Sequence, residues 1–123
     1  MVLYSAGSIG LPLLKGSAFN ASVPTGDGTD AANNIFASDL EPTNSPTAFR
    51  IYVCFVSAGL LRVMRTSGIT TVPEQLNGGT NLAAGAAYVF DIVVEIGDSI
   101  NLQYSAGGTC RSLKVLEIAG AVS

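Results

Sequence analysis

The chain contains no histidine and no tryptophan, and only two of its 123 residues are cysteines. Histidine is the commonest general base, metal ligand and near-neutral titrating group in proteins. Its absence excludes Ser-His-Asp and Cys-His catalytic arrangements and histidine-containing zinc sites, and two cysteines cannot complete a cysteine-only zinc site. We therefore expect a protein that is not an enzyme, with no catalytic residue, no metal ligand and no cofactor.

Charge is scarce as well. Charged residues make up 12% of the chain, whereas a typical soluble domain has about 25%. Six Lys and Arg stand against nine Asp and Glu, which gives a pI of about 4.6. Binding to nucleic acid needs clustered basic side chains, so we expect no nucleic acid among the partners. The apolar fraction of 48% instead predicts a folded chain with a hydrophobic core.

Long apolar stretches are also missing. The longest, residues 51–61 and 82–94, are shorter than the roughly 20 residues that cross a bilayer, and Asp91 interrupts the second. Residues 1–4 include no basic side chain, and glycines and a proline break the apolar stretch that follows, so no signal peptide is indicated. We expect a protein made in the cytoplasm without export and without a membrane partner.

Residues 1–46 differ from the rest of the chain. They carry one lysine against four carboxylates, and they hold four of the five prolines. Turn-rich stretches at 23–28 and 42–46 predict an extended N-terminal arm with long loops, in which short strands near 11–14 and 35–38 are the only regular elements. The predicted organisation is therefore an arm over residues 1–46 and a folded domain over residues 47–123.

From residue 47 onward the sequence alternates with a period of two, which is typical of strands that bury one face. Turn residues separate six such segments, at 49–56, 60–66, 69–76, 88–95, 100–104 and 110–118. Pro73 places the third segment at a sheet edge or a bulge. The pattern predicts an all-β fold, an antiparallel β-sandwich, and within that class a jelly roll.

Two acidic loops are candidate sites. Asp27 and Asp30 flank a glycine, and carboxylates in such a loop suit calcium, but the ligand spacing of an EF-hand is absent. We favour a solvated turn there. Asp98 follows Gly97, and we expect its carboxylate to accept N–H bonds within a hairpin turn.

Three arginines and two cysteines also leave alternatives open. Arg50, Arg62 and Arg65 lie on neighbouring predicted strands. They could form a basic patch that binds an acidic partner or an anionic sugar. Alternatively, they pair across strands with carboxylates such as Asp91 or Glu95, and we favour this pairing.

Cys54 and Cys110 are either bonded or free. We favour free, partly buried thiols, because cysteine behaves as a small hydrophobe and sequence alone cannot show that the two approach closely.

The four tyrosines, Tyr4, Tyr52, Tyr88 and Tyr104, could supply a platform on which a sugar stacks. Tyr88 and Tyr104, however, are in phase with predicted core positions of their strands. We therefore favour packing in the core or in an interface.

Residues 47–53 and 89–105 resemble small jelly-roll proteins of phage particles, namely head decoration (cement) proteins and related fibre or tail modules. Some of these share a trimeric jelly roll like that of tumour necrosis factor. The resemblance covers about residues 47–118 and lies in the strand spacing, the Gly97-Asp98 turn and the low-charge surface rich in small residues. It implies no catalytic residues, self-association around a symmetry axis, and a terminal arm that grips a neighbouring subunit.

We therefore expect a structural virion protein on the capsid exterior, made in the host cytoplasm. It would decorate or cement the capsid as a homo-oligomer, most simply a trimer, with the major capsid protein as a further partner. A carbohydrate- or receptor-binding module of a phage fibre or tail is one alternative. A self-assembling filament or surface subunit is another.

The faces of the predicted strands that point away from the core indicate where copies of the chain would meet. In a sheet that faces water, positions alternating with the core should be polar, but several here are apolar. The candidate interface residues are Tyr52, Val56, Val89, Val93, Leu116 and Ile118. Either a neighbouring subunit or the chain's own arm would cover them, over residues 50–56 and 89–95, and we favour the neighbour.

Overall fold

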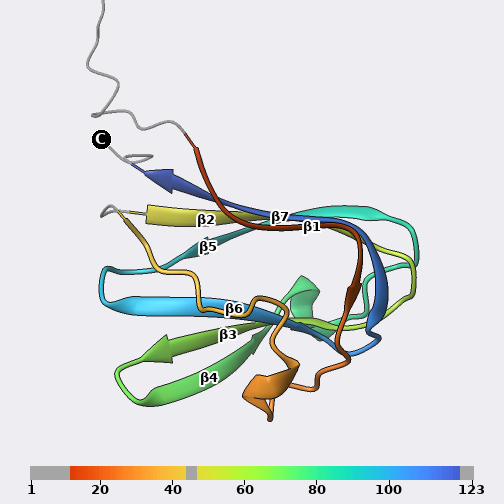
Figure 1. Cartoon of the computed structure of the whole chain (residues 1–123), viewed down its shortest axis with the longest axis horizontal. Helices are drawn as coiled ribbons and strands as arrows, with labels where there is room; N and C mark the ends of the chain where they lie inside the picture. Colours follow the sequence, from red (N-terminus) through yellow and green to blue (C-terminus); the bar gives the residue numbers. More distant parts are fainter. Residues whose placement is uncertain (1–11, 44–46, 120–123) are drawn as a thin grey trace, which may run out of the picture.

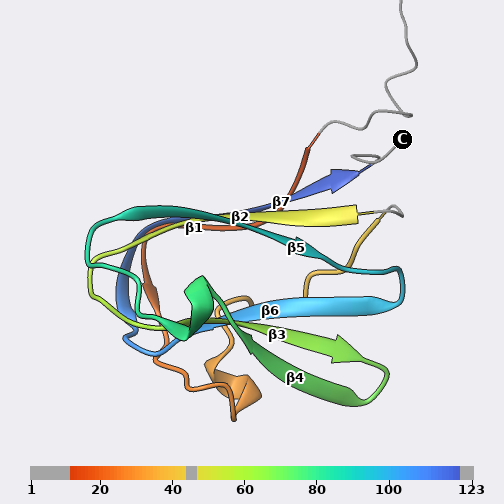
Figure 2. The same cartoon turned by 180° about the vertical axis from the view of Figure 1, so that it is seen from behind.

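The computed structural model describes residues 12–43 and 47–119. Across these ranges, two antiparallel sheets pack face to face, as the two layers of Figures 1 and 2 show. The strands are β1 (Leu13–Val23), β2 (Thr47–Phe55), β3 (Leu61–Ser67), β4 (Thr70–Gln75), β5 (Ala87–Val93), β6 (Asp98–Tyr104) and β7 (Gly108–Ala119). Two short 3-10 turns, η1 (Ala31–Asn33) and η2 (Asn77–Gly79), lie in the connections.

The strand order is β1-β7-β2-β5 in the four-stranded sheet and β4-β3-β6 in the three-stranded sheet. The predicted all-β, antiparallel sandwich is therefore confirmed, while the jelly roll remains a prediction. Only β3 and β4 form a hairpin between sequential neighbours in the described chain. The turn at Gly97-Asp98, predicted as a hairpin tip, instead carries the chain from β5 in one sheet to β6 in the other.

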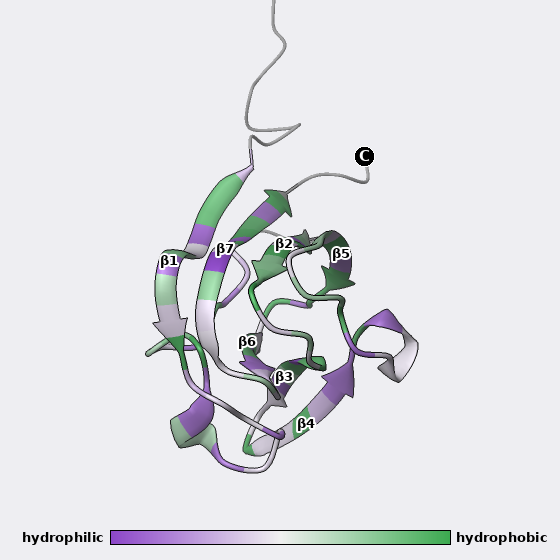
Figure 3. Cartoon of the chain, turned by 90° about the vertical axis from the view of Figure 1, so that its right-hand side faces the viewer, coloured by the Kyte–Doolittle hydropathy of each residue, from purple (hydrophilic) through white to green (hydrophobic). Residues whose placement is uncertain are grey.

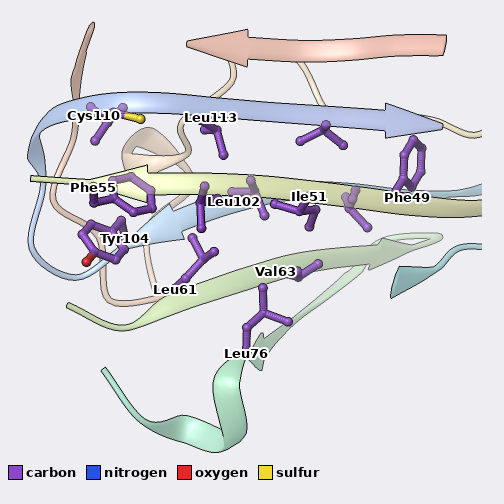
Figure 4. Packing of buried hydrophobic residues seen from close by; sticks show 14 of the residues in the cluster. Phe49, Ile51, Phe55, Leu61, Val63, Leu76, Leu102, Tyr104, Cys110 and Leu113 are labelled. Carbon is purple, nitrogen blue, oxygen red and sulfur yellow. The ribbon is translucent and has the colours of Figure 1, made fainter. Parts of the chain in front are cut away.

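The core lies between the two sheets, and its residues follow the predicted alternation. From β2, Phe49 and Ile51 are fully buried, and from β6 so are Leu102 and Tyr104. Figure 4 shows these side chains meeting others from β3 and β7 in the space between the layers. At one end, the rings of Phe55 and Tyr104 stack with centroids 3.7 Å apart. The Tyr104 hydroxyl donates to the Ser57 carbonyl at 2.6 Å, so this buried ring keeps its polar end satisfied.

The predicted arm over residues 1–46 is wrong for its described part. Strand β1 pairs with β7 from Leu13 opposite Glu117 to Val23 opposite Gly108, so it is an edge strand of the sandwich. Its inward positions carry small residues, because a Cβ on Gly16 would lie 2.8 Å from the Phe36 ring. The short strand expected near 11–14 overlaps only the first two residues of β1. A strand that buries glycine and alanine gives little alternation, which explains why the sequence pattern did not reveal the rest of β1. Residues 35–38 form bends, and no strand.

Residues 24–43, which we call the covering segment, pack on β6. Backbone bridges join Thr25 to Tyr104 and Leu40 to Ile100, along the edge of β6 that faces away from β3. Leu40 and Ile100 exchange N–H···O bonds of 2.7 and 2.9 Å. The covering segment therefore completes the edge of the three-stranded sheet and does not project from the domain.

The covering segment also satisfies two polar side chains of β6 that alternation alone would place in water. The Gln103 carboxamide accepts from Gly28 N–H at 2.7 Å and donates to the Asp30 carbonyl at 2.9 Å. Asn101 both accepts from Phe36 N–H and donates to the Phe36 carbonyl. Both side chains are buried, and each has partners of the kind that make such burial tolerable.

A buried carboxylate ties β1, the covering segment, β2 and β7 together. Glu117 on β7 has no exposed surface, and its Oε2 accepts from the Thr43 N–H at 2.5 Å and from the Thr47 hydroxyl at 3.1 Å. The Lys15 ammonium lies 3.4 Å from Oε1 and donates to the Thr43 hydroxyl at 3.0 Å. Lys15 reaches this site because it is the extra residue of a bulge between Leu14 and Gly16.

We predict that Glu117→Gln lowers the free energy of unfolding by about 3 kcal/mol, because it leaves the Lys15 ammonium without its buried counter-charge. Chemical denaturation of the variant and the parent measures this difference. Glu95→Gln, at an exposed position in the β5–β6 turn, is the matched control and should change stability little. A loss as small for Glu117→Gln as for the control would contradict a stabilising role for this cluster.

We also predict a stability plateau at neutral pH that ends on the alkaline side. Burial raises the pKa of the Cys110 thiol to about 11 and that of Tyr104 to about 12. Both groups are neutral when protonated, so the fold favours the protonated forms. This stability is present below the unfolded pKa values of roughly 8.5 and 10 and is lost as the pH rises through the folded values.

The melting temperature should therefore change little between about pH 6 and 8 and fall above about pH 9, where the unfolded thiol begins to ionise. Cys110→Ala should make the alkaline decline shallower. Thermal melts over this range test the prediction, and an unchanged alkaline slope in Cys110→Ala would refute the assignment to this thiol.

Candidate functional site

Side chains that alternate with the core on the four-stranded sheet form one continuous surface, which we call the outer face. Its rows follow from the register of the strands. Tyr52 of β2 lies between Val89 of β5 and Lys114 of β7, and Ala48 lies between Val93 and Ile118. The outer face comprises Leu14, Ser17, Phe19, Ala48, Arg50, Tyr52, Cys54, Ala87, Val89, Asp91, Val93, Ser112, Lys114, Leu116 and Ile118.

The structure brings the predicted interface residues together on this surface. Five of them, Tyr52, Val89, Val93, Leu116 and Ile118, belong to the outer face, and Val56 follows directly after the end of β2. The side chains of Val93 and Val89 are 67% and 55% exposed, and Val56 and Tyr52 are 40% and 36% exposed. Leu116 and Ile118 are half-buried. The apolar alternation therefore does mark a surface and not a second core.

The sequence reasoning missed two large apolar residues of the outer face, both on β1. Phe19 is 77% exposed and Leu14 is 60% exposed. The bulge after Leu14 and the left-handed backbone of Asn20 (φ 47°) interrupt the period of two on both sides of this strand. The one feature of the sequence that pointed to this part of the outer face is Phe19, a large aromatic residue among small ones.

The charges of the outer face largely neutralise one another. Arg50 donates to both carboxylate oxygens of Asp91, at 2.8 and 3.0 Å, across the β2–β5 pair. The Arg50 guanidinium holds the pKa of the Asp91 carboxyl below its usual range. Lys114 adds one positive charge. Such a surface suits a largely apolar partner better than a strongly charged one.

A groove of about 500 Å³ runs over the outer face. Phe19 and Leu116 line it together with Tyr52, Val89 and Lys114, so all four strands of the sheet contribute. The covering segment lies on the other sheet and leaves this groove open. Of the residues predicted as an arm, those from 24 to 43 therefore do not lie over residues 50–56 or 89–95.

The three arginines do not form a basic patch. Arg50 lies on the outer face, whereas Arg65 donates to both Glu74 oxygens at 2.8 and 3.1 Å and to the Val93 carbonyl at 2.9 Å. Arg62 is half-buried, on the side of β3 that the Gly28 loop approaches. The favoured interpretation, pairing across strands, is confirmed for Arg50 with Asp91, and Arg65 takes Glu74 rather than Glu95.

The acidic loops and the cysteines have structural roles. Asp27 accepts from the Thr29 hydroxyl at 2.6 Å and the Thr29 N–H at 3.1 Å, bonds that lower the pKa of its carboxyl. Asp30 caps η1 through the Ala32 N–H. Within the described ranges no group of three or more potential metal ligands gathers. Cys110 is buried in the core and Cys54 lies on the outer face, so the sheet separates the two free thiols.

The tyrosines do not form a common platform. Tyr104 is a core residue, and the half-buried Tyr88 stacks on Phe90 at 6.0 Å while its hydroxyl accepts from the Ala83 N–H. Tyr52 alone lies on the outer face, and Tyr4 lies outside the described residues. The prediction that Tyr88 and Tyr104 pack with the core is confirmed.

Among the helical turns that the structure describes, none is long and apolar enough to cross a membrane. Comparison of the sequence with known proteins gives no matching family model and no matching curated protein.

Proposed function

We propose that this chain is a structural protein that assembles with copies of itself through the outer face, and that it decorates or cements the exterior of a virus capsid. The observation that carries the self-assembly is the outer face itself, where Phe19, Val89 and Val93 are each more than half exposed. Contiguous apolar patches beyond a few hundred Å² are unusual on proteins that remain monomers.

The mechanism is mechanical. Burial of apolar surface contributes about 25 cal/mol per Å², so 400 Å² of outer face would contribute roughly 10 kcal/mol before the cost of association. The Arg50–Asp91 pair is already complete within one chain, so a partner need not supply a counter-charge for it. The trimeric order and the major capsid protein as a partner come from the resemblance to phage decoration proteins.

A carbohydrate- or receptor-binding role is a second candidate, favoured by one observation. The groove combines an aromatic ring, Tyr52, with the cation of Lys114, and this combination suits an anionic sugar. A glycan array at high protein concentration tests this candidate, and an empty array would remove it.

We predict that Phe19→Glu and Tyr52→Glu each shift the full chain toward species with fewer subunits at tens of micromolar, because each places a charge in the apolar interface. Native mass spectrometry measures the change. Ile69→Glu is the matched control, since Ile69 is fully exposed at the tip of the β3–β4 hairpin, away from the outer face. A strictly monomeric parent would contradict assembly, and oligomers of the same size as the parent's in both outer-face variants would contradict this surface.

The virion role has its own test. The protein should co-purify with particles, mild denaturant should release it, and the stripped particles should be less stable. A protein that never co-purifies with a particle would remove the capsid role while leaving self-assembly standing.

A further inference from the structure

Three of the four sheet edges carry features that hinder pairing with another strand. Strand β1 has its bulge at Lys15 and the left-handed Asn20, and β4 has Pro73, which lacks an N–H. The covering segment already pairs with β6. Bulges, prolines and covering loops are the common means by which proteins prevent edge-to-edge association.

The fourth edge, β5, is regular. Its register with β2 runs without a shift from Val93 opposite Ala48 to Ala87 opposite Cys54, and it contains neither proline nor glycine. No described strand pairs with its other side. Figure 3 shows β5 at one border of the upper layer and β1 at the opposite border.

The hydrogen-bonding direction of each β5 residue follows from two contacts at its end. Val94 N–H donates to the Thr47 carbonyl of β2 at 3.4 Å, while the Val93 carbonyl points the other way and accepts from Arg65 at 2.9 Å. Because direction alternates along an antiparallel strand, Val89 and Asp91 turn their N–H and C=O groups away from β2. Arg65 takes the Val93 carbonyl, and among residues 12–43 and 47–119 no hydrogen bond reaches the outward groups of Val89 and Asp91.

The side chains at this edge are compatible with a neighbouring strand. Val89 is 55% exposed, and Asp91, the one charge on β5, is neutralised by Arg50 of the same chain. Phe90 and Tyr88 are half-buried at the inner side of the edge and stack on each other. A charge that points outward usually protects an edge strand, but here the ion pair removes much of that protection.

We propose that β5 pairs antiparallel with β5 of a second copy across a two-fold axis, joining the two four-stranded sheets into one. The occupant is a second copy because an open, regular edge needs a regular strand as its partner, and β5 itself is the one such edge in the described chain. A contact centred on Phe90 sets Val89 of one copy opposite Asp91 of the other, which keeps the two carboxylates from lying directly opposite each other. The proposal rests on the proposed self-assembly and departs from the trimer that the resemblance implies, since a two-fold contact gives an even number of subunits.

The test uses Val89→Pro in the full chain. Proline is tolerated at an edge position whose N–H points away from the sheet, so the fold should persist, as circular dichroism will show. The contact would lose the Val89 N–H bond in both copies. We expect the dissociation constant to rise by about 30-fold or more, measured by native mass spectrometry over a concentration series. Val89→Thr, which keeps the N–H and the β-branched shape, should behave as the parent.

Hydrogen exchange on the parent gives a second measurement that does not depend on a variant. If β5 pairs with itself, the amides of Val89 and Asp91 should exchange roughly tenfold or more slowly at high protein concentration than at low concentration. The amides of Phe90 and Ile92, which face β2, should be protected at both concentrations.

The outcomes separate this contact from the outer face. Dissociation by Val89→Pro, with concentration-dependent protection of Val89 and Asp91, supports the β5 contact. An oligomer that Phe19→Glu dissociates and Val89→Pro does not would overturn it while leaving the proposed function intact. A strictly monomeric parent, or one with an odd number of subunits as its only assembled form, would also overturn it.

Discussion

Burying β6 on every side is the constraint on which the rest of this molecule depends. Its apolar face, with Leu102 and Tyr104, closes the core, and its polar face carries Asn101 and Gln103, which tolerate burial only with hydrogen-bond partners. The covering segment supplies those partners and pairs with the edge of β6 as well. A stretch engaged in this way is not available to cover the other sheet, so no described segment lies over the outer face or pairs with the free edge of β5.

The Glu117 cluster has a complementary effect at the other end of the covering segment. Glu117 holds the end of the covering segment through Thr43 and the start of β2 through Thr47. Through Lys15 it also holds β1 beside β7. The bulge that brings Lys15 inward also makes the β1 edge irregular. The bulge that carries this ion pair, together with the left-handed Asn20, therefore hinders pairing at the β1 edge, while β5 at the opposite edge contains neither a bulge nor a left-handed residue.

The sequence predicted the strands from Thr47 onward from the alternation of their side chains. It predicted most of the outer face because β2, β5 and β7 each turn one face to the core and the other to a surface. Of β1 it predicted only the first residues, because the inward positions further along this strand are glycine and alanine. Alternation alone would place Asn101 and Gln103 on the solvent side of β6, because it cannot report a loop that folds over a polar face. Arg65 of β3 donates to the Val93 carbonyl at the end of β5. This bond joins the two sheets, and strand periodicity does not encode contacts between sheets.

The outer face and the β5 edge meet at Val89, whose side chain belongs to the first and whose backbone belongs to the second. A two-fold contact through β5 consumes the same edge in both copies, so it closes on itself and cannot propagate. Growth beyond a pair would then require the outer faces, which the joined sheet presents side by side on one surface. Because the outer face is apolar and its ion pair is internal, such growth would depend on buried area more than on ionic strength. A subunit that has one self-terminating contact, through β5, and one broad apolar contact, through the outer face, can form a defined oligomer and still bind to a larger apolar surface.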